Sequence, residues 1–279
     1  MANEIEKGAL YVVATPIGNL LDITERAKHV LENVDFVAAE DTRVSGKLLS
    51  VYGIKNSFVS YHEHNKNGAG EIILQKLMSG NAGALITDAG VPAISDPGED
   101  VVRLCRDNGI KVIPVPGACA FVTALSASGM KSRRFVFEGF LPTDKKEMAQ
   151  VLEVVKNDSR TTVFYEAPHR LIKTLKIMAE ALGERNICLA RELTKLNEQF
   201  QYTTFQQAIE YFADKEPRGE YVIIVEGCSK DTQDVFWKEM TVEEHALHYI
   251  QSGLTKMEAI KKCAKDRGVA KNEIYKYFV

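Results

Sequence analysis

Carboxylates gather at three places in the first hundred residues, namely Glu40 with Asp41, Asp88, and Asp96. Side chains of this kind can ligate a metal ion or accept a proton from a substrate. His62 and His64 would extend a metal site, but no spacing among these residues is diagnostic of one. The five cysteines are far apart and offer no paired spacing that suits zinc. We therefore predict a site that uses no metal.

Two of these aspartates lie in one unusual loop, "TDAGVPAISDPG" (87–98), which also holds two prolines and two glycines. An apolar run of strand type, "GALI" (83–86), precedes it directly. Apolar runs bounded by Gly, Pro and Asp are typical of a buried strand that ends in a turn. Taken alone, the loop is also compatible with a plain connection from a strand to a helix.

The common nucleotide-binding patterns are absent. A dinucleotide fold places Gly-x-Gly-x-x-Gly directly after its first strand, whereas "LYVVA" is followed by "TPIGNLLDIT", which has one glycine. Gly68 and Gly70 follow a polar stretch, and Ile73 stands where the third glycine belongs. Gly46 and Lys47 are followed by a leucine, so a phosphate-binding Walker loop fails as well.

The elements that must position these residues alternate along the first half of the chain. Strand-like runs such as "ALYVVA", "FVAAE" and "GALIT" take turns with helical patterns such as "ITERAKHVLENV" and "EDVVRLCRDNG". This rhythm predicts a mostly parallel sheet with crossover helices. Ligands bind such sheets at the carboxyl ends of the strands, which is where the 87–98 loop begins.

Later segments predict a second sheet and a helical tail. Between 135 and 225 some strands follow one another with too little chain for a crossover, so we expect a mixed sheet. From about residue 230 the pattern is wholly helical, with two helices joined by "DRGVAK" in a helix-turn-helix-like arrangement. Its expected apolar positions are Met257, Ile260, Cys263 and Ala264 on one face and Ile274, Tyr277 and Phe278 on a second.

Charge is distributed unevenly. Residues 255–279 contain seven Lys or Arg against three Asp or Glu, a net charge of +4, so the rest of the chain carries −7 of the overall −3. A basic end on an acidic body indicates a local contact with a polyanion, and a solvated helix face is the alternative. No apolar segment suits a signal peptide or a membrane span, so we expect a cytoplasmic protein.

Six ordered motifs carry a family resemblance: "VATPIGNLLDIT" (13–24), "AAEDTRVSGKLL" (38–49), "TDAGVPAISDPG" (87–98), "VPGACA" (115–120), "FYEAPHR" (164–170) and "RELTKLNEQ" (191–199). Together they resemble the ribosomal RNA small-subunit methyltransferase I group of the tetrapyrrole methylase superfamily. The resemblance spans roughly residues 8 to 279, because a helical tail is also a feature of the family.

The resemblance implies an activity and an architecture. The activity is methyl transfer from S-adenosylmethionine to the ribose 2′-oxygen of a cytidine in the 16S RNA of the small ribosomal subunit. The fold is α/β, with two α/β domains, the cofactor in the cleft between them, and a small helical tail. The expected divisions are 1–129, 130–229 and, for a basic tail that contacts RNA, 230–279. The family also implies a homodimer and, as substrate, the RNA alone or the assembled subunit.

The resemblance also implies which residues hold the cofactor. Gly90 would let a ligand approach the backbone, and Pro92 and Pro97 would restrict the loop. Asp88 and Asp96 would place negative charge near a sulfonium cation. The full expected set is Pro16, Asp88, Ala89, Gly90, Ile94, Asp96, Cys119, Ala120, Tyr165, Leu193 and Gly219.

The transfer needs an alcohol positioned in line with the methyl group and relieved of its proton. Glu40 and Asp41 are the candidates for a general base, since they end a strand at the same rim as the 87–98 loop. Arg43 is a candidate for phosphate binding, with Lys195 and Glu198 opposite. His169, at an expected helix start, is a weaker candidate for contact with the substrate.

Two alternatives come from other functional classes. A tetrapyrrole-modifying methylase would share the fold but has no need of a basic helical tail. A non-enzymatic RNA-binding protein would explain the tail but would leave the six motifs without a purpose. Cofactor binding separates the second alternative from both enzymes, and the acceptor molecule separates the two enzymes.

Overall fold

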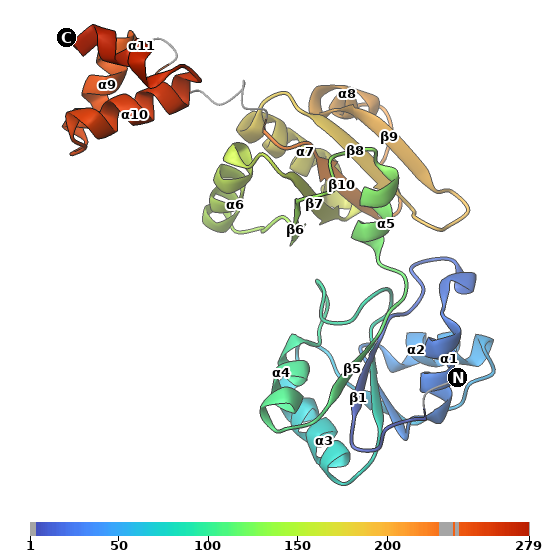
Figure 1. The fold of residues 1–279 in the computed structure, drawn as a ribbon. Coiled ribbons are helices and arrows are strands. Elements are labelled where there is room, and N and C mark those ends of the chain that lie inside the picture. The colour runs from blue at the N-terminus through green and yellow to red at the C-terminus, as the bar shows by residue number, and fades with distance from the viewer. Residues whose placement is uncertain (1–3, 229–236, 238–239, 279) are drawn as a thin grey trace. The chain divides into compact units, whose positions relative to one another are not determined.

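The computed structural model describes residues 4–228, 237 and 240–278. The chain divides into two compact units, residues 1–228 and 229–279. The first unit contains two five-stranded sheets, and the second is helical (Figure 1). No helix among the described residues is long and apolar enough to cross a membrane.

The first sheet is wholly parallel, with the order β3-β2-β4-β1-β5. Its strands are β1 (Leu10–Val13), β2 (Phe36–Ala39), β3 (Phe58–Ser60), β4 (Gly83–Ile86) and β5 (Val112–Val115). Strands β2 and β4 are buried along their whole length. Parallel strands covered on both faces read as continuous apolar runs, which is why these segments were recognisable in the sequence.

Helices cover both faces of this sheet. They are α1 (Glu25–Asn33), α2 (Thr42–Val51), α3 (Lys66–Met78) and α4 (Glu99–Asp107), and a short 3₁₀ helix without buried residues, η1 (Leu20–Asp22), precedes α1. Alternate strand residues divide between two apolar clusters: Val37 and Ile86 pack with α1 and α2, while Phe36 and Leu85 pack with α3 and α4 (Figure 1). Because all five strands are parallel, their carboxyl ends meet at one edge of the sheet.

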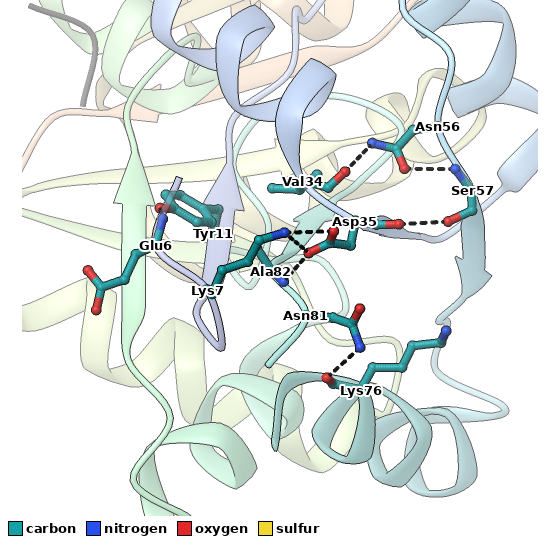
Figure 2. Close-up of polar contacts among 10 residues, drawn as sticks. All are labelled: Glu6, Lys7, Tyr11, Val34, Asp35, Asn56, Ser57, Lys76, Asn81 and Ala82. Carbon is teal, nitrogen blue, oxygen red and sulfur yellow. Dashed lines mark hydrogen bonds and ion pairs between the residues drawn. The ribbon is translucent and has the colours of Figure 1, made fainter. Parts of the chain in front are cut away.

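The amino edge of the first sheet is held by polar contacts around Asp35 (Figure 2). Lys7 Nζ lies 2.8 Å from both carboxylate oxygens, and the Ala82 amide donates to Oδ2 at 2.6 Å. These hydrogen bonds, led by that of Lys7, hold the pKa of Asp35 below its ordinary value. The carboxylate thus ties the beginnings of β2 and β4 to the segment before β1.

The second sheet has the order β6-β7-β10-β8-β9, and only the β6–β7 pair is parallel. This confirms the predicted mixed sheet. Its strands are β6 (Phe135–Phe140), β7 (Thr161–Glu166), β8 (Asn186–Arg191), β9 (Gln199–Thr204) and β10 (Tyr221–Val225). Its helices are α5 (Ala120–Ala127), α6 (Lys145–Asn157), α7 (Pro168–Leu182) and α8 (Phe205–Tyr211).

The two faces of the second sheet have different neighbours. One packs on α6, α7 and α8 through residues such as Leu189 and Ile223, and the other packs on α5 through Ala190 and Val222. Because side chains alternate along a strand, consecutive residues of β8 and β10 serve different layers. Helix α5 follows β5 of the first sheet directly, so it links the two sheets.

The second unit contains α9 (Val242–Gln251), α10 (Lys256–Arg267), α11 (Lys271–Tyr275) and η2 (Lys276–Phe278). The "DRGVAK" turn joins α10 to α11, with Gly268 in the left-handed conformation at φ +66°. The expected apolar faces are right for Ile260, Cys263, Ala264 and Ile274, which form the core with Ala246 of α9. They are wrong for Met257 and Tyr277, which are 45% and 54% exposed, because three short helices leave room only for the inner positions.

Candidate functional site

Three loops meet at the carboxyl edge of the first sheet, following the adjacent strands β4, β1 and β5. Thr15 and Gly90 exchange two backbone hydrogen bonds, of 2.9 and 3.1 Å, and so join the loops after β1 and β4. A Cβ at Gly117 would lie only 2.9 Å from that of Ala14, so the loop after β5 packs tightly on the loop after β1. The expected cofactor residue Pro16 follows Thr15 directly.

The 87–98 loop has an unusual backbone. Gly90 and Gly98 have φ values of +83° and +147°, and two residues with side chains, Ala93 and Ser95, have φ values of +66° and +64°. Non-glycine residues in this region cost free energy and cluster where function requires a particular shape. Ile94, between the two strained residues, is 43% exposed. The loop is therefore more than a plain connection between β4 and α4.

Acidic side chains converge at this edge. The Asp41 amide lies 3.4 Å from Asp88 Oδ1, which brings the end of β2 next to the loop after β4. Burial, and then the charge of Glu40, raise the pKa of Asp96 to about 6. Burial, and then the charge of Asp88, raise the pKa of Glu40. Within residues 4–228, no lysine or arginine forms an ion pair with Glu40, Asp88 or Asp96.

Asp41 has a different environment from its neighbour Glu40. Its Oδ1 accepts the amide of Arg43 at 2.8 Å at the start of α2, and its Oδ2 lies 2.9 Å from the Arg43 guanidinium. These contacts with Arg43 lower the pKa of Asp41 to about 2. Asp41 thus caps a helix and neutralises a cation. The Arg43 side chain itself is 87% exposed and faces solvent beside the acidic group.

An apolar wall comes from the second sheet. Ala120, Tyr165 and Leu193 belong to one cluster on the α5 face, which also includes Ile17 from the loop after β1. The Phe121 amide donates to the Tyr165 hydroxyl at 3.2 Å, and burial raises the pKa of Tyr165 to about 12. Cys119 caps α5, and burial raises the pKa of its thiol, so it is not an activated nucleophile.

A second strained loop, residues 192–198, contacts the loop after β1. Glu192 and Thr194 have φ values of +50° and +66°. The Asn19 amide donates to Thr194 Oγ1 at 3.0 Å, and the Thr194 amide donates to Glu198 Oε2 at 2.6 Å. A Cβ at Gly18 would lie 2.5 Å from Lys195 Cγ. The loop after β1 is therefore held directly against this second strained loop.

Gly219 and Lys195 both contact Glu192. A Cβ at Gly219 would lie 2.4 Å from the Glu192 side chain, and Gly219 has a φ of +76°. Lys195 Nζ binds Glu192 at 2.9 Å and Glu220 at 3.1 Å. Lys195 is thus paired with Glu192 and Glu220, and Glu198 accepts the Thr194 amide, all within the loops that border the second sheet. His169 lies in the first turn of α7, exposed to solvent, next to an Arg170 that pairs with Glu166.

The structure brings most of the expected residues into two groups. The acidic and loop group holds Pro16, Glu40, Asp41, Asp88, Ala89, Gly90, Ile94 and Asp96, and the apolar group holds Cys119, Ala120, Tyr165 and Leu193. Gly219 belongs to neither and lies beside Glu192. Glu192 and Thr194 are not predicted from the sequence to belong to the site, because neither residue type favours a left-handed backbone conformation.

Among the described residues, no group of three or more His, Cys, Asp or Glu side chains is arranged to hold a metal ion. The acidic group nevertheless suits a positively charged ligand, because its carboxylates repel one another and form no ion pair with a lysine or arginine in residues 4–228, although the charge of His62 acts weakly to lower the pKa of Glu40. A small organic cation that touches the Gly90 backbone would relieve that repulsion.

Comparison with known proteins agrees with this geometry. The sequence model of the tetrapyrrole (corrin/porphyrin) methylases matches residues 9–209. A solved cobalt precorrin-4 methyltransferase has the same fold, with a TM-score of 0.60 at 17% identity over 78% of this chain and 95% of that one. A uroporphyrin-III C-methyltransferase from Thermus thermophilus, solved with S-adenosylhomocysteine, gives a TM-score of 0.55 at 16% identity over 78% and 97%. The predicted fold class is confirmed.

Curated relatives are much more similar in sequence. Ribosomal RNA small subunit methyltransferase I of Bacillus subtilis is 49% identical over 97% of this chain and 94% of that protein. The proteins of the same name from Halalkalibacterium halodurans and Escherichia coli O157:H7 are 46% and 43% identical, over 98% and 97% of this chain and 95% and 94% of theirs. The six motifs, the two-sheet fold and these full-length matches place this chain in the ribosomal RNA small subunit methyltransferase I family of the tetrapyrrole methylases.

Proposed function

We propose that this protein transfers a methyl group from S-adenosylmethionine to the ribose 2′-hydroxyl of a cytidine in 16S ribosomal RNA. The observation that carries the proposal is the unpaired acidic group of Glu40, Asp88 and Asp96 beside the strained 87–98 loop. Family membership supports methyl transfer to small-subunit RNA. We place the activity in the cytoplasm, in a homodimer.

The cofactor supplies a methyl group carried on a positively charged sulfur. Asp88 and Asp96 attract that charge, and the backbone near Pro16 and Gly90 allows close approach. Ala120 and Leu193 supply an apolar surface for the uncharged parts of the ligand. Glu192 and Thr194 act from the other loop by holding the segment around Asn19 in place.

Glu40 is the general base in this proposal. A carboxylate with a raised pKa accepts a proton from an alcohol more readily than one held near 2, and Asp41 is already engaged with Arg43. The exposed Arg43 guanidinium lies beside the acidic group, where it can bind a phosphate of the RNA. Alignment of the two reacting groups supplies much of the remaining acceleration.

The decisive experiment follows the methyl group. The protein is incubated with labelled S-adenosylmethionine and with small ribosomal subunits from cells that lack this protein. The labelled nucleotide is then mapped. We expect label on one cytidine, and no label when that position carries 2′-deoxycytidine. Undiminished labelling of the deoxy substrate would refute the ribose assignment, and labelling of a tetrapyrrole instead would favour the alternative acceptor.

Cofactor binding can be tested without any RNA. Gly90→Val places a β-branched side chain at a φ of +83° and on the surface that the ligand approaches. Calorimetry with S-adenosylhomocysteine should give clear binding by the parent protein and at least tenfold weaker binding by the variant, about 1.4 kcal/mol. Equal affinities would remove the 87–98 loop from the cofactor site.

We further propose that the expected divisions at 129/130 and 229/230 separate functional domains, and that the basic tail contacts RNA. Lys261, Lys265 and Lys271 are exposed on α10 and α11, whereas Arg267 donates to the backbone of Met240 and is structural. Replacing the three lysines by glutamine should weaken RNA binding and reduce its salt dependence, with cofactor affinity unchanged. Methylation equal to that of the parent across a salt series would assign the tail another role.

A further inference from the structure

A separate pocket of about 90 Å³ lies on the second sheet, between β8, β9, β10 and the end of α8. Leu189 and Tyr221 are its buried residues, and its polar lining consists of Arg191, Gln199, Gln201, Lys215 and Glu216. The β8–β9 register pairs Arg191 with Gln199 and Leu189 with Gln201. The register therefore explains why these side chains share one face.

This pocket is distinct from the candidate cofactor site. Leu189 and Tyr221 pack with α7 and α8, whereas Ala190, Leu193 and Tyr165 pack with α5 on the other face. The sheet itself separates the two. The pocket thus uses residues that none of the roles assigned above requires.

The lining of the pocket is rich in hydrogen-bond donors and positive charge. Arg191 Nε is buried with no hydrogen-bond partner, and Arg191 forms no ion pair within residues 4–228. An unpaired buried donor destabilises the folded protein, and more so when it is charged, so an anionic acceptor at this position would relieve that cost. Tyr221 adds a phenolic hydroxyl, and burial raises its pKa above the ordinary value.

Two further charged residues of the lining, Lys215 and Glu216, contribute to the net charge of the pocket. Lys215 Nζ lies 3.9 Å from the centre of the Tyr211 ring and forms no ion pair in the described chain. Glu216, the acidic residue of the lining, lies 3.9 Å from the Arg218 guanidinium, which offsets its charge. The balance of Arg191, Lys215 and Arg218 against Glu216 is positive, so the pocket attracts an anion.

We propose that this pocket binds a phosphate group, and that in the RNA substrate it holds one backbone phosphate on the face of the second sheet opposite the candidate cofactor site. The RNA assignment rests on the proposed function. A volume of about 90 Å³ has room for roughly three water molecules, enough for a phosphate and too little for a nucleoside. The fork of an arginine matches phosphate oxygens in geometry, and glutamine amides add further donors.

The test compares Arg191→Gln and Lys215→Gln with the control Lys173→Gln, which removes an exposed lysine of α7 outside the pocket. Affinity for a small-subunit RNA fragment is measured across a salt series. Each pocket variant should reduce the slope of log K against log salt by about 0.7–0.9, the value for one lost phosphate contact. The control should change the slope by less, and S-adenosylhomocysteine affinity should stay the same in Lys215→Gln.

Inorganic phosphate separates the pocket from its RNA assignment. Phosphate should raise the melting temperature of the parent above that in chloride of equal ionic strength, and both pocket variants should lose the difference. Phosphate stabilisation with unchanged salt slopes would overturn the RNA assignment, and equal behaviour of the parent and Lys215→Gln in both assays would overturn the pocket. Failure of the proposed function would instead appear as no methyl transfer by the parent, and the phosphate assay would still decide the pocket.

Discussion

Asp35 and Glu40 flank the same strand, β2, and the structure gives their carboxyl groups opposite properties. Asp35 precedes the strand at the amino edge of the sheet, where Lys7 and the Ala82 amide lower its pKa (Figure 2). Glu40 follows the strand at the carboxyl edge, where burial and Asp88 raise its pKa. The four residues of β2 thus separate Asp35, whose charged form is stabilised, from Glu40, whose charged form is disfavoured.

The difference shows that the amino edge of the sheet contributes to stability, whereas the carboxyl edge is arranged for binding. At the amino edge the acidic side chain is fully used by hydrogen bonds that join β2, β4 and the segment before β1. At the carboxyl edge the acidic side chains oppose one another, and the loop beside them has a strained backbone. Unfavourable electrostatics and strain in one place are typical of a binding site, because a ligand can relieve them.

The largest expected effect tests the carboxyl edge. Glu40→Gln should lower the single-turnover rate of methyl transfer by about 10²- to 10⁴-fold, the usual contribution of a general base. Asp41→Asn is the matched control, because asparagine also caps a helix and Asp41 is already paired with Arg43. It should slow transfer by less than tenfold. Equal effects of the two variants, with folding intact, would remove Glu40 from this role.

Asp96→Asn should separate binding from stability. Cofactor affinity should fall by about 10- to 100-fold, the equivalent of about 1–3 kcal/mol for a charged contact. The unfolding free energy at pH 8 should rise by on the order of 1 kcal/mol, because an opposed charge is removed. Calorimetry and denaturant unfolding measure the two. A variant that binds as the parent does would exclude Asp96 from the site.

The pH dependence of this gain has a definite sign. The pKa of Asp96 is raised from 3.8 to about 6, so its protonated form favours the folded state. The stabilisation from its protonation is complete below about pH 3.8 and is lost as the pH rises through 6. The advantage of Asp96→Asn over the parent should therefore shrink as the pH falls from 8 to 5. A constant advantage would place its origin elsewhere.

Asp35→Ala tests the amino edge and should act in the opposite way. It removes the acceptor of the Ala82 amide and should lower the unfolding free energy by about 1–3 kcal/mol. Because the pKa of Asp35 is lowered, its contribution is present above about pH 3.8 and is lost as the pH falls through the lowered value. The methyl transfer rate of the folded variant should equal that of the parent. A slower rate would show that the two edges are coupled.

The smallest effect is expected for Lys7→Gln. The side chain is 62% exposed, and exposed ion pairs contribute about 0–1 kcal/mol. Denaturant unfolding in low and high salt should show a small loss of stability that salt removes. A loss as large as that of Asp35→Ala would mean that Lys7, rather than the Ala82 amide, is the main partner of the carboxylate.

Much of the architecture was accessible from local pattern. Continuous apolar runs such as "FVAA" and "GALI" indicate buried parallel strands, and the ends of these runs place Glu40 and Asp88 at one edge of the sheet. The mixed second sheet followed from connections too short for crossovers. The exposed Met257 and Tyr277 show the limit, because helical period predicts a stripe but not how much of it neighbouring helices cover.

The sequence by itself determined the order of the strands along the chain, the edge that carries the motifs and the family. The hydrophobic period, the apolar runs and the turn residues are local properties of the sequence. Because the strands are parallel, these properties also indicate which loops lie at the same edge of the sheet. Only the tertiary structure decided that Asp41 binds Arg43 while Glu40 remains unpaired in residues 4–228, that Thr194 reaches Asn19, and that Arg191 lines a separate pocket. The charge state and partner of a side chain depend on burial and on residues distant in the chain, and no local pattern encodes those distances.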